Sequence, residues 1–327
     1  MKKLLDIKDI FVEFHTDDGV VHALNGASIE MEEGITTGLV GETGAGKTTL
    51  AKCVMGIIKK PTGHITSGEI LYRDCDLLKM KDSDLRKIRG NEISMIFQDP
   101  MTALNPVMTV GEQIAETIRV HEKLNRIEAQ RKACEMLELV GIKADRVNDY
   151  PHQFSGGMKQ RVVIAIALAC SPKLLIADEP TTALDVTIQA QVLEMMTNLQ
   201  KKLGTSTLLI THDLGVVAQT CQKVAIMYAG EIVEYGTVRD VLLNPSHPYT
   251  KGLINCIPKI HIKEKRLHPI EGLMPDPTSI LDGCAFSPRC ALATELCRKQ
   301  HPLMNQICGE HSCRCFFTEA GKEKDNV

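Results

Sequence analysis

A glycine-rich segment with one lysine and three threonines lies near the start of the chain. It reads Gly41-Glu42-Thr43-Gly44-Ala45-Gly46-Lys47-Thr48-Thr49 and fits the pattern G-x-x-x-x-G-K-[ST]. Glycines let such a loop turn so that successive backbone N–H groups point at phosphate oxygens, and a following helix N-terminus adds partial positive charge. The Lys47 ammonium can neutralise β- and γ-phosphates, and the Thr48 hydroxyl can ligate Mg²⁺. The pattern therefore predicts a phosphate-binding loop for a nucleoside triphosphate.

Two adjacent carboxylates follow the apolar run Leu174–Ala177. Ligands of open α/β sheets bind beyond the carboxyl ends of the strands, so these acids are expected beside the phosphate loop. Asp178 is predicted to hold the Mg²⁺ shell, and Glu179 to point toward the γ-phosphate and polarise a water. Two acids after an apolar run are by themselves usually a solvated strand end. The phosphate loop in the same chain favours the catalytic interpretation.

Cysteine is unusually frequent, with 12 residues, and six of them lie between Cys284 and Cys315. Four of these could supply thiolates from one loop-rich segment: Cys284, Cys290, Cys297 and Cys315. Thiolates suit zinc or iron–sulfur clusters, although the tight C-x₂-C pairs usual in zinc sites are missing here. Free thiols or disulfides are the third interpretation, and a reducing compartment disfavours disulfides. Cys308 and Cys313 are surplus to a set of four.

The overall composition is that of a globular protein. The chain has 327 residues, of which 43% are hydrophobic and 24% charged, which excludes disorder, collagen and coiled coil as the main class. The net charge of -3 gives no sign of a polyanion partner. The N-terminus lacks the apolar stretch of a signal peptide, and the longest apolar run, Val162–Cys170, is about half a membrane span. We therefore expect a protein that is soluble, or peripheral through a partner.

Strand and helix patterns alternate along the chain. Strands are predicted at Leu5–Phe14, Val20–Met31, Gly38–Val40, Ile93–Phe97, Leu174–Ala177, Thr207–Thr211 and Val224–Tyr228. Helices are predicted at Thr48–Ile58, Val110–Val120, Arg126–Val140, Gln160–Cys170 and Ile188–Leu203. This order predicts an α/β fold with a mainly parallel sheet that carries a helical insertion at about 99–158. Six prolines between residues 245 and 277 indicate that a separate, loop-rich tail begins at about residue 245.

Further motifs carry a family resemblance. Phe154-Ser155-Gly156-Gly157-Met158-Lys159-Gln160-Arg161 resembles the signature motif of ABC ATPases, with Met158 where Gln is commonest. Gln98 resembles the Q-loop glutamine, Thr181–Asp185 the D-loop, and His212 the switch histidine. Phe14 aligns with the aromatic residue that stacks on adenine, with Phe11 as a rival. Because the motifs occur in the family's order, residues 1–245 resemble an ABC ATPase domain, and 246–327 form an extension.

The resemblance implies a P-loop NTPase with a RecA-like core, a mixed sheet and a helical subdomain at 99–158. It implies that Ser155, Gly156 and Gly157 bind the γ-phosphate held by the opposite subunit, so that two subunits sandwich two ATP molecules. His212 would contact the γ-phosphate, and Gln98 would link Mg²⁺ and the attacking water to the insertion. The resemblance also implies that Asp185 of the D-loop is a nucleotide-binding residue.

Three segments resemble one branch of the family, the importers of dipeptides, oligopeptides and nickel. These segments are Gln98–Pro106, His247–Thr250 with Ile257-Pro258, and Gly283–Cys290. The branch implies an ATPase at the cytoplasmic face of the membrane that powers two permease subunits, fed indirectly by a solute-binding protein. The insertion at 99–158 would receive the permease's cytoplasmic coupling helices. The second ATPase subunit is expected to be a related chain, or else an identical one.

The cysteine pattern of the tail also resembles that of this branch, which implies a [4Fe–4S] cluster bound by the tail. The family spacing His-x-x-x-Cys matches His311 to Cys315, which favours Cys315 over Cys313 as the fourth ligand, after Cys284, Cys290 and Cys297. Zinc stays open as the alternative metal. Two alternative functions also stay open: import of nickel or another small solute, and a soluble ABC ATPase that acts on the ribosome or DNA. The second alternative is disfavoured by the single cassette without heptads and by the balanced charge.

Overall fold

The computed structural model of the chain describes residues 2–182, 184–257, 269–279 and 281–318. Ala183 of the D-loop and Pro258 of the importer-type segment lie outside the described residues. The chain divides into two compact units. The first comprises Met1–Leu4, Glu32–Thr36 and Leu77–Ile210, and the second comprises Leu5–Met31, Thr37–Asp76 and Thr211–Val327. Each unit is built around its own strands.

The first unit holds three parallel strands in the order β8-β7-β6. Their bounds are β6 (Ile93–Ile96), β7 (Leu174–Asp178) and β8 (Ser206–Thr211). Ile176 of the central strand pairs with Met95 on one side and Leu208 on the other. All residues of these strands are buried. This agrees with their unbroken apolar runs, which are typical of parallel strands. The strands expected at 93–97, 174–177 and 207–211 are confirmed.

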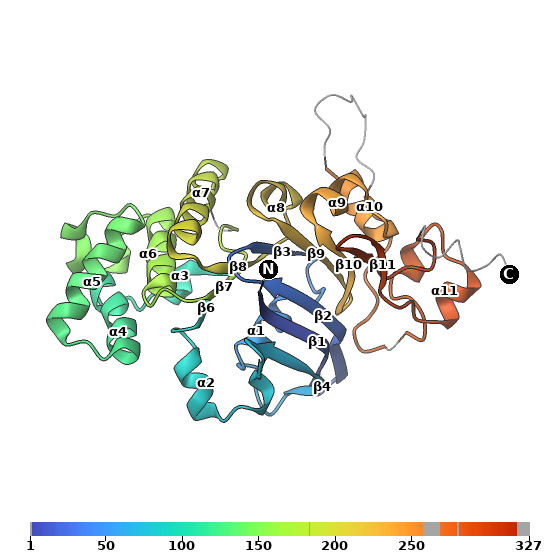
Figure 1. Cartoon of the computed structure of the whole chain (residues 1–327), viewed down its shortest axis with the longest axis horizontal. Helices are drawn as coiled ribbons and strands as arrows, with labels where there is room; N and C mark the ends of the chain where they lie inside the picture. The colour runs from blue at the N-terminus through green and yellow to red at the C-terminus, as the bar shows by residue number, and fades with distance from the viewer. Residues whose placement is uncertain (1, 183, 258–268, 280, 319–327) are drawn as a thin grey trace. The chain divides into compact units, whose positions relative to one another are not determined.

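The helices of the first unit include the insertion expected at 99–158. They are α2 (Asp82–Ile88), α3 (Pro100–Ala103), α4 (Val110–Glu122), α5 (Arg126–Leu139), α6 (Gly156–Leu168) and α7 (Val186–Leu203), with short 3-10 turns η1 (Leu77–Lys79), η2 (Ala144–Asn148) and η3 (Pro151–Gln153). The side chain of Thr109 caps α4, and Asn125 with Glu128 forms a capping box at α5. The helices α4 and α5 lie side by side and pack through their apolar faces (Figure 1).

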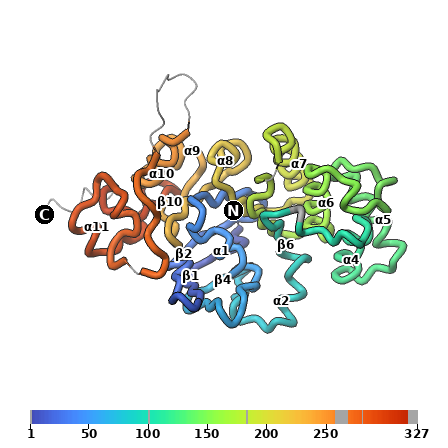
Figure 2. The backbone as a smooth tube through the Cα atoms, turned by 180° about the vertical axis from the view of Figure 1, so that it is seen from behind, coloured from blue at the N-terminus to red at the C-terminus, as the bar shows by residue number. Residues whose placement is uncertain are grey.

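The second unit contains an antiparallel sheet in the order β2-β1-β4-β5. Its strands are β1 (Lys3–Thr16), β2 (Gly19–Glu32), β4 (Gly63–Tyr72) and β5 (Cys75–Asp76), and Figure 2 shows β1, β2 and β4 side by side. The hairpin between β1 and β2 turns at Gly19, whose φ of 135° suits glycine, as the turn signal at 17–19 predicts. The strand β4 was not predicted from the sequence.

A mixed sheet forms the other half of the second unit, in the order β11-β12-β10-β9-β3. Its strands are β3 (Thr36–Val40), β9 (Lys223–Tyr228), β10 (Glu231–Thr237), β11 (Asn305–Cys308) and β12 (His311–Cys313). β3 and β9 pair in parallel, whereas β9, β10, β12 and β11 pair antiparallel. The expectation of a separate, loop-rich tail is therefore incomplete, because residues 305–313 add two strands to the sheet that holds β3.

The helices of the second unit are short. They are α1 (Lys47–Val54), α8 (Leu214–Thr220), α9 (Val238–Leu243), α10 (Pro248–Asn255) and α11 (Glu295–Lys299), with the 3-10 turn η4 (Ser287–Arg289). The helix predicted at 48–58 ends at Val54, because Gly56 takes a left-handed φ of 60°. In the part of the chain that the structure describes, no helix has the length and apolar character needed to span a bilayer.

Candidate functional site

The phosphate-binding loop connects β3 to α1 in the second unit. Gly44 and Gly46 have φ values of 85° and 102°, a conformation that other residues rarely adopt. A Cβ on Gly41 would lie 2.2 Å from the carbonyl oxygen of Met227, so only glycine fits between the loop and β9. The backbone N–H of Gly230 donates to the carbonyl of Ala45 at 2.9 Å, which fixes the loop to the β9–β10 turn. The loop conformation therefore depends both on its own glycines and on the neighbouring backbone.

Lys47 opens α1 and is buried, with 6% exposure. Its Nζ donates to the carbonyl oxygens of Gly41 at 2.7 Å and Glu42 at 2.9 Å, so the ammonium lies across the loop. Thr48 and Thr49 follow in the first turn of α1 and are half-buried. Among the described residues no side chain caps this helix N-terminus, which leaves the arrangement suited to an anion. The binding of a triphosphate by Lys47, Thr48 and Thr49 stays a prediction.

The two carboxylates stand at the carboxyl end of β7 in the first unit. Asp178 is buried, and Glu179 is half-buried with a φ of 47°, an uncommon value outside glycine. The amide Nε2 of Gln98 donates to Glu179 Oε2 at 3.2 Å, and the Thr182 hydroxyl donates to the same oxygen at 2.9 Å. Three predicted residues, Gln98, Asp178 and Glu179, therefore lie at the ends of neighbouring strands.

The signature segment begins α6 in the same unit. Ser155 is the N-cap, and its Oγ accepts the N–H of Met158 at 3.4 Å. Ser155 and Gly156 are exposed, and a Cβ on Gly157 would lie 2.6 Å from Cγ2 of Ile188 on α7. Asp185 caps α7 by accepting the N–H of Ile188 at 3.0 Å, a structural role in addition to the predicted one. The N-terminus of α6 is exposed and has two glycines in its first turn, so further backbone N–H groups there can accept an anion.

The remaining predicted residues of the ATPase site belong to the second unit. His212 directly follows β8 and is exposed. Phe14 on β1 is half-buried, with its ring against Gly63, while the rival Phe11 is 40% exposed and lies against Gly26. Thr48 belongs to the second unit but Gln98 and Asp178 to the first, so their joint binding of Mg²⁺ stays a prediction.

Two residues that sequence reasoning missed contact the phosphate loop. The N–H of Glu42 donates to the phenol oxygen of Tyr249 at 3.0 Å, and Arg289 forms an ion pair with the Glu42 carboxylate at 3.0 Å. Tyr249 and Arg289 belong to segments that were singled out only for their importer-type pattern. No local signal could have linked them to the loop, because Glu42 and Arg289 are 247 positions apart.

The four cysteines expected as ligands line a single pocket in the extension. Cys284, Cys290, Cys297 and Cys315 share it with apolar side chains that include Phe286, Phe316 and Phe317. Cys308, which is exposed, and Cys313, which is buried in β12, are not among its lining residues. The preference for Cys315 over Cys313 agrees with this placement.

The pocket is not a formed metal cage. Its free volume of about 20 Å³ is close to that of one water, and among the described residues no three His, Cys, Asp or Glu side chains are arranged to hold a metal ion. Burial raises the pKa of Cys284 to about 11 and also raises the pKa of Cys290 and Cys315, so these thiols stay protonated at neutral pH unless a cation compensates. The expected metal-binding extension therefore has a fitting set of donors but no formed site.

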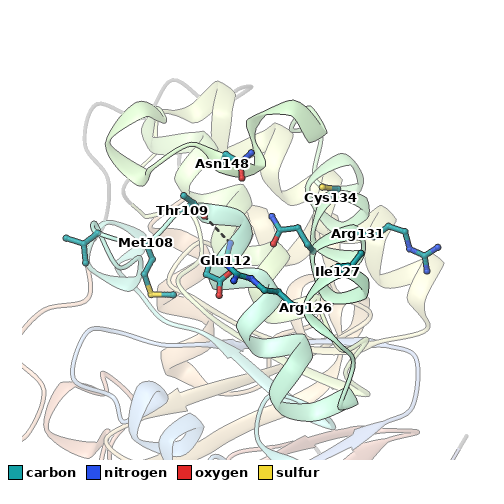
Figure 3. A pocket seen from close by; sticks show the side chains of 10 residues that line it. Met108, Thr109, Glu112, Arg126, Ile127, Arg131, Cys134 and Asn148 are labelled. Carbon is teal, nitrogen blue, oxygen red and sulfur yellow. Dashed lines mark hydrogen bonds between the residues drawn. The ribbon is translucent and has the colours of Figure 1, made fainter.

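A groove of about 780 Å³ opens between α4 and α5 in the first unit (Figure 3). Its lining combines apolar and charged side chains: Val107, Met108, Thr109, Glu112, Arg126, Ile127, Gln130, Arg131, Cys134 and Asn148. Val107 and Ile127 are 79% and 83% exposed, an uncommon exposure for apolar residues. Such a groove can receive a short helix with mixed apolar and polar faces.

Comparison with known proteins assigns both parts of the chain. Residues 24–182 match the family ABC transporter, and residues 233–297 match the family Oligopeptide/dipeptide transporter, C-terminal region. The dipeptide transport ATP-binding protein DppD of Bacillus subtilis is 46% identical over 99% of this chain and 97% of its own length. The oligopeptide transport ATP-binding protein OppD of the same organism is 49% identical over 96% of this chain and 89% of its own.

Solved structures show the same cassette. A dimeric ATP-binding cassette in a post-hydrolysis state with ADP and Pi superposes with a TM-score of 0.64 at 26% identity, covering 72% of this chain and 99% of the other. The cbiO1 subunit of a Clostridium perfringens ABC transporter superposes with a TM-score of 0.64 at 29% identity, covering 75% of this chain and 92% of the other. The ABC ATPase fold with a mixed sheet and helices, expected from the motifs, is confirmed.

Proposed function

The chain belongs to the family of ATP-binding subunits of dipeptide and oligopeptide ABC transporters and is an ATPase, and we propose that it powers peptide uptake through separate membrane permease subunits. The observation that carries this proposal is the match of residues 233–297 to the C-terminal region of oligopeptide and dipeptide transporters. This region lies outside the general cassette and distinguishes this branch from other ABC ATPases. We place the subunit peripherally at the cytoplasmic face of the membrane.

The ATPase chemistry follows from the residues of each unit. Lys47 and the backbone N–H groups of residues 41–49 hold the β- and γ-phosphates, with Thr48 as a ligand of Mg²⁺. Asp178 and Gln98 would complete the ligands of Mg²⁺, which when bound would neutralise charge on the phosphates. Glu179 orients and deprotonates the attacking water, and its contact with Gln98 fixes the carboxylate for this role. His212 holds the γ-phosphate, and Phe14 stacks on the adenine.

The active form in this proposal is a nucleotide-sandwich dimer. The exposed Ser155 and Gly156 at the start of α6, with Gly157, bind the γ-phosphate on the opposite subunit. The similar cassette bound to ADP and Pi is itself dimeric, which supports this arrangement. The second subunit is a related chain or a second copy of this one, and Asp185 lies next to the shared nucleotide.

The groove between α4 and α5 is our proposed docking site for the permease (Figure 3). A cytoplasmic helix of the permease fits a groove whose lining combines the exposed apolar Val107 and Ile127 with charged side chains such as Glu112 and Arg131. The groove belongs to the same compact unit as Gln98 and Glu179.

We further propose that the cysteine pocket takes up a [4Fe–4S] cluster, with zinc as the alternative. The support is that four cysteines from separate turns of the extension line one pocket closed by phenylalanines. A cluster would be held by Cys284, Cys290, Cys297 and Cys315, and its iron would supply the positive charge that keeps the buried thiols ionised. Widening of the pocket must accompany assembly, because its free volume holds only about one water.

The decisive experiment for transport is reconstitution in vesicles. The chain, a partner ATPase subunit and two permease subunits are combined with a solute-binding protein, and uptake of labelled dipeptides and of a longer peptide is measured with and without MgATP. ATP-dependent peptide uptake that is lost without this chain is the expected result. Uptake of Ni²⁺ without peptide, or recovery of the chain with ribosomes or DNA and no permease, would contradict the proposal.

A further inference from the structure

We infer that Arg289 of the extension is a positioning residue of the phosphate loop, which neutralises and holds the Glu42 carboxylate so that the loop accepts a triphosphate. This inference rests on the proposed function, since it concerns the same nucleotide site. It concerns a residue that lies far from the cassette motifs in the sequence. It also gives the extension a direct part in nucleotide binding.

The guanidinium of Arg289 is fixed by several acceptors. Its Nη1 donates to both oxygens of the Glu42 carboxylate, at 3.0 Å and 3.2 Å, and approaches the phenol oxygen of Tyr228 at 3.4 Å. Its Nε donates to the carbonyl of Glu271 at 3.0 Å, and its Nη2 to the carbonyl of Ile270 at 3.3 Å. With its donors occupied on all sides, the charged group has one defined position beside the loop.

The position of Glu42 makes this charge necessary. Glu42 is the second residue of the phosphate-binding loop, whose other groups attract phosphate. A carboxylate at this position repels a polyanion. The Arg289 side chain is only 5% exposed, against 31% for Glu42, so water screens their attraction weakly. With Arg289 present, the pair is neutral. With Arg289 absent, the negative charge of Glu42 is uncompensated within the phosphate-binding loop.

The extension also holds the loop backbone. The Glu42 N–H donates to the phenol oxygen of Tyr249, whose ring packs against Tyr228 with centroids 4.6 Å apart and against Phe286 at 5.5 Å. Phe286 lies three residues before Arg289 and also lines the cysteine pocket. The short segment from Phe286 to Arg289 therefore contacts residues that hold the phosphate loop and also lines the cysteine pocket.

Arg289 could instead have a purely structural role, in which it only attaches the extension to the loop. This role predicts a response to mutation that differs from the response expected for charge neutralisation. If Arg289 acts only by holding the extension, removal of the Glu42 charge cannot restore nucleotide binding to an Arg289 variant. If Arg289 acts by neutralising Glu42, the second substitution removes the charge that caused the loss. The double variant thus separates the two roles.

The experiment measures the dissociation constant of a non-hydrolysable ATP analogue with Mg²⁺ by calorimetry on the full-length chain. We expect R289Q to weaken binding about tenfold, which is the effect of one uncompensated charge at this range. R289Q introduced into the E42Q background should change the affinity by less than about threefold relative to E42Q alone, because the charge that Arg289 neutralises is already absent. R298Q is the matched control, because Arg298 is an exposed arginine of the same extension.

A second variant covers the case in which R289Q folds poorly. R289K keeps the charge but loses the planar fork, so its melting temperature should fall while its affinity stays within about threefold of the wild type. Wild-type affinity in R289Q, a loss that E42Q does not reverse, or an equal loss in R289K would each overturn the inference. Absence of binding by the wild-type chain would instead contradict the proposed function itself, and this inference with it.

Discussion

Gln98 Nε2 donates to Glu179 Oε2 at 3.2 Å and so joins residues that follow two neighbouring parallel strands, β6 and β7. The hydroxyl of Thr182 donates to the same carboxylate oxygen at 2.9 Å. Glu179 itself has a φ of 47°, and such a conformation persists in a non-glycine residue only when its surroundings impose it. The carboxylate is therefore held in one orientation before any ligand arrives, as catalysis by a general base requires.

The first prediction concerns this carboxylate. Glu179→Gln should reduce the rate of phosphate release by about 10²–10³-fold, because the amide cannot accept the proton of the attacking water. MgATP binding should persist, since Gln keeps the size of the side chain, and ATP-bound dimers should accumulate. Phosphate release and size-exclusion chromatography with ATP measure both effects. Glu194→Gln, an exposed position on α7, is the control, and normal turnover in Glu179→Gln would refute the assigned role.

A second prediction concerns the close contact between the phosphate loop and β9. Gly41→Ala places a Cβ 2.2 Å from the Met227 carbonyl oxygen, and neither backbone can yield freely. We expect the variant to lose about 3 kcal/mol of stability and much of its MgATP affinity, as overpacking in a fixed site does.

The matched control is Gly309→Ala in the β11–β12 turn. Gly309 has a left-handed φ of 52°, which Gly41 does not have, and a Cβ there meets nothing within 4 Å. It should lose only about 1 kcal/mol, the ordinary cost of that conformation. Denaturant unfolding and analogue binding compare the two variants, and equal losses of stability would show that the contact with Met227 is unimportant.

Local patterns account for the part of the fold that sequence could predict. The strands at Leu174–Asp178 and Ser206–Thr211 are buried on both faces, so their composition alone marks them. The conformation of the phosphate loop also depends on its own glycines, which is why Lys47 and Thr48 could be assigned from spacing. Residues of this kind carry their structural signal within a few positions.

Other features depend on partners that are distant in the sequence. β12 has only three residues, and besides its hairpin partner β11 it pairs with a distant strand, since Cys313 and Ser312 lie opposite Glu234 and Tyr235 of β10. The ion pair of Glu42 with Arg289 has the same character, since neither residue type nor spacing indicates it. The pocket of Cys284, Cys290, Cys297 and Cys315 illustrates a third limit: spacing and the family resemblance indicated that these cysteines gather, whereas the small free volume of the pocket depends on how the surrounding segments pack.

The third prediction concerns the cysteine pocket. Protein prepared without oxygen should contain iron and sulfide and absorb broadly near about 400 nm, as iron–sulfur proteins do. Cys284→Ser and Cys297→Ser should each lose most of the iron, because both residues line the pocket. Cys308→Ser should keep it, since Cys308 is exposed outside the pocket. A colourless protein with one zinc would favour the alternative metal, and a metal-free protein would exclude both.

The last prediction concerns the groove between α4 and α5. Val107→Glu and Ile127→Glu place charges on two apolar side chains that are 79% and 83% exposed, so the isolated subunit should fold and bind MgATP as the wild type does. Recovery of permease subunits with the tagged chain should fall about tenfold or more, because desolvating a carboxylate in an apolar contact is costly. Val120→Glu is the control: Val120 is 68% exposed on α4 but does not line the groove. If all three variants retain the permease equally, the docking surface lies elsewhere. If Val120→Glu alone loses it, α4 contacts the permease through its other face.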